Sequence, residues 1–170
     1  HCPETPPIAA IDEAIELVMH KPPKVLMIDR GLAAFERVQD RDEDYAEYRR
    51  LLSTSCRACG TQVLVYCLMP NHVHLILVPA DEFGLRDALG EAHRRYTRMI
   101  NVREGWRGHL WQERFHSFVM DERHLIAAAR YVELNPVRAR LCARPEAWPW
   151  SSARAHLAGA DDDLVSVRPP

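Results

Sequence analysis

Several features of an exported or membrane-bound protein are missing from this 170-residue chain. It holds no apolar run of about 18 residues, the length that a membrane-spanning helix needs. It has no basic start followed by a leucine-rich stretch, so no secretory signal is visible. Its five cysteines are an odd number at wide spacing, which does not suit a disulfide framework. These absences predict a protein of the reducing cytosol.

Two of the cysteines, Cys56 and Cys59, have the spacing of a zinc knuckle. No second Cys-x-x-Cys pair exists to complete the four ligands of a tetrahedral site. The favoured interpretation is therefore the end of a helix, with Gly60 as its C-terminal cap.

Lysine is absent from residues 86–150. Twelve arginines outnumber eight acidic residues in this region, which gives a net charge of +4, although the whole chain has a net charge of −2. Guanidinium groups bind phosphate through paired hydrogen bonds and stack on bases. The region therefore favours a phosphate-bearing partner, although the charge alone is equally consistent with a solvated, arginine-rich helical surface.

Strand-like and helix-like patterns follow one another along the chain. Apolar, β-branched runs flank Pro70-Asn71, which predicts an antiparallel hairpin of residues 61–69 and 72–78. The other expected elements are strands at 24–28 and 110–120 and helices at 40–59, 85–102, 122–134, 136–142 and 151–157. This order predicts an α+β sandwich, with helices over one face of an antiparallel sheet, rather than a doubly wound parallel fold. Residues 1–23, with five prolines, are expected to be a partly disordered appendage.

The sharpest local feature is the pair His72 and His74. Side chains alternate along a strand, so both imidazoles project from the same face, about 7 Å apart, and can take two neighbouring positions on one metal ion. Val73 points the other way. A lone His-x-His is weak evidence, because structural histidines are common on strands.

Tyr96 lies at the middle of the apolar stripe of the helix at 85–102, so its side chain should face the sheet. If the covered face is the one that carries His72 and His74, a phenol and two imidazoles converge in one crevice. His93, one turn earlier, lies at the edge of the same stripe. The alternative is a core tyrosine with its hydroxyl satisfied at the rim, which periodicity alone favours.

A phenol and a metal in one crevice suit the breakage and rejoining of DNA. Nearby guanidinium groups and a divalent cation favour the phenolate, the form that attacks. A cation held by two imidazoles and one further ligand can polarise a phosphodiester. Attack by Tyr96 on phosphorus would leave a covalent phosphotyrosine and a free strand end, so the bond energy would be kept for a later joining step.

The segment YCLMPNHVHL at 66–75 is similar to the metal-binding segment of the single-tyrosine HUH transposases, where U is a bulky apolar residue. Four more motifs follow in the order expected for that family. They are RRYTRMIN at 94–101, GHLWQERFHS at 108–117, YVELNPVRARL at 131–141 and WPWSSARAHL at 148–157. Together the motifs resemble the branch of REP-associated tyrosine transposases. The resemblance covers residues 24–167, which are therefore expected to form the HUH tyrosine transposase domain.

The resemblance implies a ferredoxin-like α+β fold, and cleavage of single-stranded DNA at short palindromic hairpins with Mg²⁺ or Mn²⁺. By motif, His72 and His74 are the expected metal ligands and Tyr96 is the expected nucleophile. The family usually takes a third ligand from a polar residue about one turn past the tyrosine. Because residue 100 is isoleucine, the nearest amide is that of Asn101, and His93 is the alternative third ligand.

Arginines with interleaved aromatic residues predict a surface that binds single strands by phosphate contact and base stacking. The arginines expected to contact DNA are Arg94, Arg95, Arg98, Arg107 and Arg114. The expected protein is a cytoplasmic, nucleoid-associated bacterial enzyme, monomeric or homodimeric, that forms a 5′-phosphotyrosine intermediate. The alternative is a domesticated relative that binds DNA hairpins without cutting them.

Overall fold

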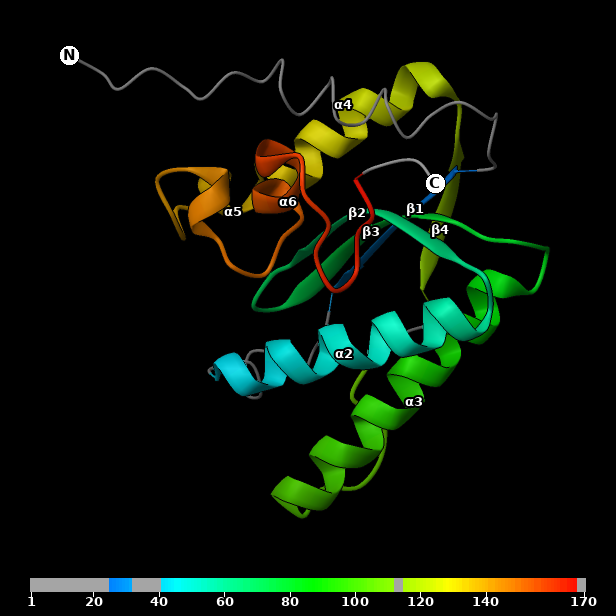
Figure 1. The fold of residues 1–170 in the computed structure, drawn as a ribbon. Helices are drawn as coiled ribbons and strands as arrows, with labels where there is room; N and C mark the ends of the chain where they lie inside the picture. Colours follow the sequence, from blue (N-terminus) through cyan, green and yellow to red (C-terminus); the bar gives the residue numbers. More distant parts are fainter. Residues whose placement is uncertain (1–24, 32–40, 112–114, 168–170) are drawn as a thin grey trace.

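The computed structural model describes residues 25–31, 41–111 and 115–167 (Figure 1). The expected appendage at residues 1–23 lies outside the described residues. The strands are β1 (Val25–Gly31), β2 (Gln62–Leu68), β3 (His72–Val78) and β4 (His116–Met120). The helices are α2 (Asp42–Ala58), α3 (Gly84–Glu104), α4 (Glu122–Glu133), α5 (Asn135–Arg138) and α6 (Ala153–Ala158), with a short 3₁₀ turn at Pro145–Ala147. None of the described helices is long and apolar enough to cross a membrane.

The four strands form one antiparallel sheet in the order β2-β3-β1-β4. Helix α2 connects β1 to β2, and helix α3 connects β3 to β4, which is the ferredoxin-like arrangement of a split βαβ unit. The α+β class, the antiparallel hairpin of β2 and β3, and the central position of the histidine strand are therefore confirmed.

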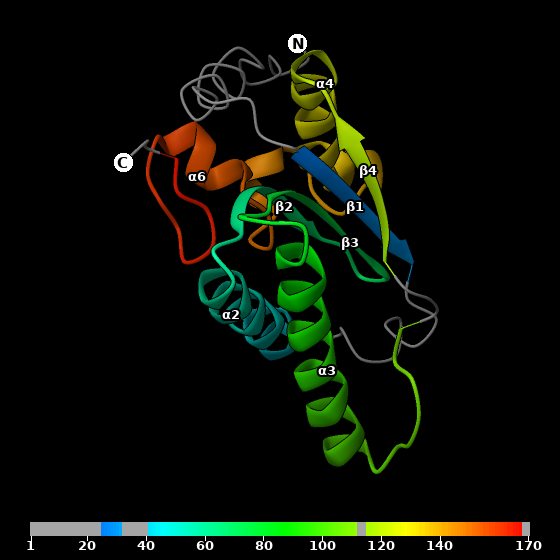
Figure 2. The same ribbon diagram turned by 90° about the vertical axis from the view of Figure 1, so that its right-hand side faces the viewer.

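One face of the sheet is covered by α2 and α3, which lie together on one side of it in Figures 1 and 2. Val73, Leu75 and Leu77 of β3 point into this layer, where they pack with Tyr48 of α2 and Leu89 of α3. All five side chains are almost completely buried. The larger of the two hydrophobic cores therefore lies between these helices and the sheet.

The opposite face is covered by α4, with α5 and α6 beside it (Figure 1). Leu125, Ala129 and Val132 of α4 pack on Val65 of β2 and Ile76 of β3. The expectation that helices cover one face is therefore correct for α2 and α3 and wrong for the domain as a whole. The physical reason lies in β3, whose residues from 73 to 77 are buried on both faces and need a cover on each.

The segment after α5 is bonded to the outer edge of β2. Its Trp150 carbonyl accepts a hydrogen bond from the backbone of Leu68, and the Ser152 backbone donates to the carbonyl of Tyr66. The indole of Trp148 donates to the carbonyl of Leu68. These bonds satisfy backbone groups at a sheet edge that would otherwise be open to pairing with another strand. They also attach the second helical layer, formed by α4, α5 and α6, to the sheet.

Two expected elements are shorter than the sequence suggested. The strand expected at 110–120 is described as β4 only from His116, and residues 112–114 lie outside the described residues. The helix expected at 136–142 is the four-residue α5, which ends at Arg138.

Candidate active site

His72 and His74 project from the same face of β3, as expected. Their Nε2 atoms are 2.8 Å apart, and their ring planes are perpendicular. Nδ1 of His72 lies 2.6 Å from Oδ1 of Asn71. Because an amide oxygen only accepts, Nδ1 of His72 donates, which leaves the lone pair of this ring on Nε2.

The face that carries the two imidazoles is the one beneath α4 and α5. The Asn135 side-chain nitrogen lies 2.9 Å from Nε2 of His74, and the Tyr131 ring stands edge-on to the His74 ring with centroids 5.7 Å apart. Tyr131 is 41% exposed, whereas His74 is 1% exposed. A solvent-accessible phenol and an amide therefore meet the histidine pair at the junction of α4 and α5.

Local sequence rules explain this placement. Helix α4 begins at Asp121, whose side chain accepts a hydrogen bond from the backbone of His124. Residues four apart lie on the same side of a helix, so Tyr131 and Asn135 are neighbours, and Asn135 follows directly on the end of α4 at Leu134. Pro136 suits the first turn of α5, where a backbone donor has no intrahelical partner.

The donor set fits a divalent cation. Nε2 of His74 lies within hydrogen-bond distance of both Nε2 of His72 and the side-chain nitrogen of Asn135, so two imidazoles and an amide meet at one point. Ligand nitrogens at right angles on a cation about 2.1 Å away would be about 3.0 Å apart, close to the observed spacing.

A rotation of the Asn135 amide by half a turn would offer its oxygen as the third donor. No three side chains of His, Cys, Asp and Glu cluster as a metal site within the part of the chain that the structure describes. An amide oxygen suits Mg²⁺ or Mn²⁺. The set His72, His74 and Asn135 leaves coordination positions for water or phosphate oxygens.

Tyr96 does not meet the histidines. It is completely buried in the layer between α2, α3 and the sheet. The centroid of its ring lies 5.2 Å from that of Tyr48 and 6.4 Å from that of Trp111. The apolar stripe of α3 does face the sheet, as expected, but it covers the face of Val73, and the sheet separates it from the imidazoles. The expectation that Tyr96 faces His72 and His74 is therefore wrong.

The two expected third ligands are also wrong, because both belong to α3 in the same distant layer. Asn101 donates a side-chain hydrogen bond to the carbonyl of Gly108. Nε2 of His93 is bonded to the hydroxyl of Tyr48, and its ring stacks on Trp111 with centroids 3.7 Å apart. His93 is thus a core histidine that joins α2 to α3.

Tyr131 and Asn135 are the site residues that sequence reasoning missed. The signal was present in the YVELNPVRARL motif, which places a tyrosine and an amide one helical turn apart. The family pattern expects a polar ligand about one turn past the tyrosine. Asn135 lies one turn past Tyr131 and fits this pattern. Asn101 does not fit it relative to Tyr96.

A buried polar cluster holds α4 in place behind Tyr131. Glu133, which is completely buried, accepts hydrogen bonds through Oε1 from the hydroxyl of Ser152 (2.7 Å) and from Nδ1 of His156 (2.5 Å). The same hydroxyl lies 3.1 Å from the backbone nitrogen of Tyr66 on β2. Glu133 thus connects α4 to α6 and to the sheet, and it orients the exposed side of α4 that carries Tyr131.

Four of the five expected DNA-binding arginines lie on or just after α3. All four are exposed. Arg94, Arg98 and Arg107 line one shallow groove with Trp106, and Arg95 lines a neighbouring hollow that shares Arg94 and Arg98. Hydrogen bonds from Arg94 and Arg95 hold the pKa of Glu91 well below its usual range, at about 2. Arg114 lies outside the described residues.

Cys56 and Cys59 lie at the C-terminal end of α2, as expected. Cys56 is buried in the core of α2, where burial raises the pKa of its thiol to about 12 and so disfavours the thiolate that binds zinc. Gly60 follows the helix with a left-handed φ of 63°, as expected for a C-terminal cap.

Comparisons with known proteins place the chain in a family and match its fold. A family model described as IS200-like transposase matches residues 36–135, a segment that runs from before α2 to Asn135. A solved structure of a REP-associated tyrosine transposase bound to a REP hairpin has a TM-score of 0.63 at 18% identity, and the match covers 86% of this chain and 87% of that one. At this identity the likeness establishes a shared fold.

Two further matches are weaker. A solved structure from Deinococcus radiodurans R1, described as a candidate transposase, has a TM-score of 0.48 at 16% identity over 68% of this chain and 92% of that one. Propionate–CoA ligase of Escherichia coli strain K12 is 33% identical over 106 residues, which are 59% of this chain. The match spans only 16% of the ligase's length, so most of that protein has no counterpart here.

Proposed function

Because the chain belongs to the IS200-like transposase family, we propose that it cleaves and rejoins single-stranded DNA, with Tyr131 as the nucleophile. The family that the five motifs predicted is thereby confirmed. The observation that carries the proposal is the contact of Tyr131 with His74 at the point where the Asn135 amide lies beside the same imidazole. Tyr131 replaces Tyr96 in this role, because only Tyr131 is both exposed and beside the imidazoles.

The reaction follows from the position of the phenol. Oη of Tyr131 attacks the phosphorus of a phosphodiester, the bond from phosphorus to the 3′ oxygen breaks, and a 5′-phosphotyrosine and a free 3′ end result. The phenol releases its proton to solvent, and the departing 3′ oxygen takes one up. The reverse attack by a 3′ hydroxyl restores the phosphodiester, so strand transfer needs no external energy source.

His72, His74 and Asn135 are the residues that would hold Mg²⁺ or Mn²⁺. When bound, the cation supplies Lewis-acid polarisation of the phosphate and neutralises charge that develops in the transition state. The chain itself orients the site: Asn71 holds the ring of His72, and the buried Glu133 holds the helix that carries Tyr131.

The proposed substrate is single-stranded DNA with short palindromic hairpins. The solved relative of the same fold was captured with a REP hairpin. The groove lined by Arg94, Arg98 and Arg107 offers guanidinium groups for phosphates and the exposed Trp106 for a base. A cytoplasmic, nucleoid-associated protein acting as monomer or homodimer is consistent with this substrate.

The decisive experiment mixes the protein with labelled hairpin DNA and Mn²⁺ and looks for a protein–DNA adduct that resists denaturant. Tyr131→Phe should abolish the adduct while hairpin affinity stays within about twofold, because the ring and its packing remain. Tyr96→Phe is the matched control and should keep the adduct. An adduct that survives Tyr131→Phe contradicts the assignment. Hairpin binding with no adduct from the wild type identifies the alternative, a DNA-binding protein that does not cut.

A further inference from the structure

The end of α5 carries an unusual backbone conformation. Arg140 has a φ of 59°, and it is the only non-glycine residue with a positive φ in the described ranges. In this left-handed region the Cβ of an L-residue crowds its own carbonyl, so an arginine here costs stability that a glycine would not.

The hydrogen bonds show why the chain must turn this way. The backbone nitrogen of Leu141 donates to the carbonyl of Pro136 (2.9 Å), and that of Arg140 donates to the carbonyl of Val137 (3.0 Å). This pair of bonds is the Schellman motif, in which the residue at the position of Arg140 is left-handed and is usually glycine.

Three other described helices follow the glycine rule, whereas α4 runs directly into α5 through Leu134, which has a right-handed conformation. Helix α2 ends in the same pair of bonds, from Thr61 to Cys56 and from Gly60 to Arg57, with glycine at the left-handed position. Helices α3 and α6 also end in left-handed glycines, Gly105 and Gly159. Among the helix ends in the described residues that turn through a left-handed residue, the one at α5 has arginine in place of glycine, and α5 begins with the proposed metal ligand Asn135.

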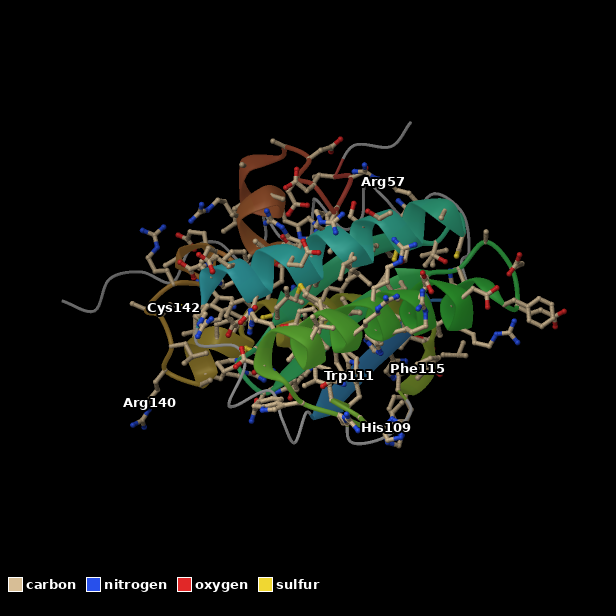
Figure 3. The ribbon with its side chains drawn as sticks, turned by 90° about the horizontal axis from the view of Figure 1, so that it is seen from below. Arg57, His109, Trp111, Phe115, Arg140 and Cys142 are labelled. Atoms are coloured by element: carbon tan, nitrogen blue, oxygen red, sulfur yellow. The ribbon has the colours of Figure 1, made fainter. Side chains whose placement is uncertain are left out.

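Two arginines at this corner have different surroundings: Arg138 contacts the proposed nucleophile, and Arg140 faces solvent. The guanidinium carbon of Arg138, two residues earlier, lies 5.2 Å from the ring centroid of Tyr131. Arg140 is exposed and projects away from the body of the protein (Figure 3). Residues 136–145 hold three arginines and no acidic residue, so this corner is positively charged.

We propose that Arg138 and Arg140 bind phosphates of the DNA strand that leads into the Tyr131 site. One guanidinium on the ring of the phenol that attacks phosphorus, and a second that projects into solvent two residues later, can contact phosphates of the same strand. A residue that costs backbone stability is retained where its side chain has a role that glycine cannot fill. The proposal rests on the proposed function, since it assigns the strand that Tyr131 would cut.

The test measures stability and DNA affinity of Arg140→Gly together. Both are measured in a Tyr131→Phe background, so that binding is not mixed with cleavage. Thermal unfolding gives the stability, and fluorescence anisotropy with a hairpin that carries a single-stranded flank gives the affinity. The thermal midpoint should rise by about 2 °C, because the strain is relieved. Affinity should fall about 3- to 10-fold, and the salt slope of log K should shrink by about 0.7, the value for one phosphate on a single strand.

Matched variants separate charge from conformation. Arg140→Lys keeps the charge and should keep most of the affinity, whereas Arg140→Asn tolerates the left-handed backbone without charge and should bind like Arg140→Gly. Arg50→Gln, an exposed arginine on α2, should change neither quantity.

Three outcomes would overturn the proposal: wild-type affinity and salt slope for Arg140→Gly, an equal loss for a blunt hairpin that has no flank, or an unchanged or lower thermal midpoint. The proposed function fails separately, if the unmutated protein forms no adduct with Mn²⁺. Binding to the flanked hairpin can be measured in either case.

Discussion

The side-chain amide of Asn135 lies 2.9 Å from Nε2 of His74, although 61 residues separate the two in the chain. This contact joins the beginning of α5, directly after the helix that carries Tyr131, to strand β3 of the sheet. It also identifies which polar residue can complete a metal site with the two histidines.

Removal of this amide should weaken metal binding. We expect Asn135→Ala to raise the Mn²⁺ concentration needed for half-maximal adduct formation by about 10-fold or more, on the order of effects seen for groups around metal sites. Asn135→Asp keeps an oxygen donor and should keep a measurable site. Asn101→Ala is the control, because the Asn101 side chain donates to the carbonyl of Gly108 in the other layer, and its removal should leave the Mn²⁺ requirement unchanged. An Asn101 effect as large as that of Asn135 would refute the assignment.

Glu133 should be essential to the stability of the second helical layer. Glu133→Ala leaves the buried partners Ser152 and His156 without their acceptor, so we expect a loss of about 3–5 kcal/mol in the free energy of unfolding. Glu133→Gln keeps one acceptor oxygen and should cost less, roughly 1–3 kcal/mol. Urea unfolding measures both values. Equal, small losses for the two variants would show that the cluster does not hold α4.

Tyr96 should behave as a core residue. Its ring fills the space between α2, α3 and the sheet, so Tyr96→Ala should destabilise the protein by about 3–5 kcal/mol. Tyr96→Phe keeps the ring and should be much milder. The measurement is the unfolding midpoint in urea, accompanied by the adduct assay. If Tyr96→Phe left the midpoint intact but eliminated the adduct, Tyr96 would regain its expected catalytic role.

The groove on α3 should contribute salt-dependent affinity. Arg98→Gln combined with Arg107→Gln removes two exposed guanidinium groups, and the salt slope of hairpin binding should fall by up to about 0.9 for each duplex phosphate that these groups neutralise. Arg86→Gln, which lies at the beginning of the same helix and outside the groove, serves as the comparison. A double variant that binds with the wild-type slope would show that the groove does not touch DNA.

Buried thiols should make the protein sensitive to alkali. The pKa of Cys56 is raised by burial from 9.0 to about 12, so the folded state keeps its proton over a range in which the unfolded state loses it. The stability that the protonated Cys56 thiol contributes is therefore fully present below pH 9, and it is lost as the pH rises from 9 towards 12. Urea unfolding midpoints at about pH 8 and about pH 10 test this, with Cys56→Val expected to show a smaller decrease. Equal decreases for the two proteins would contradict the prediction.

The sequence by itself determined the local structure and the family. Period-2 alternation placed His72 and His74 on one face of a strand, and helical periodicity placed Tyr96 on the sheet-facing side of α3; both are confirmed. These properties depend on residues close together in the chain, and five separated motifs in order identify a family without any knowledge of packing.

Only the tertiary structure decided which tyrosine meets the histidines. Periodicity tells which side of a helix faces a sheet, but not which face of the sheet the helix covers. The strand β3 is apolar on both faces, so its sequence holds no preference between α3 and α4. The crossover connections place α3 over Val73 and leave the histidine face to α4, and this long-range packing brings Tyr131 and Asn135, rather than Tyr96 and Asn101, to the imidazoles.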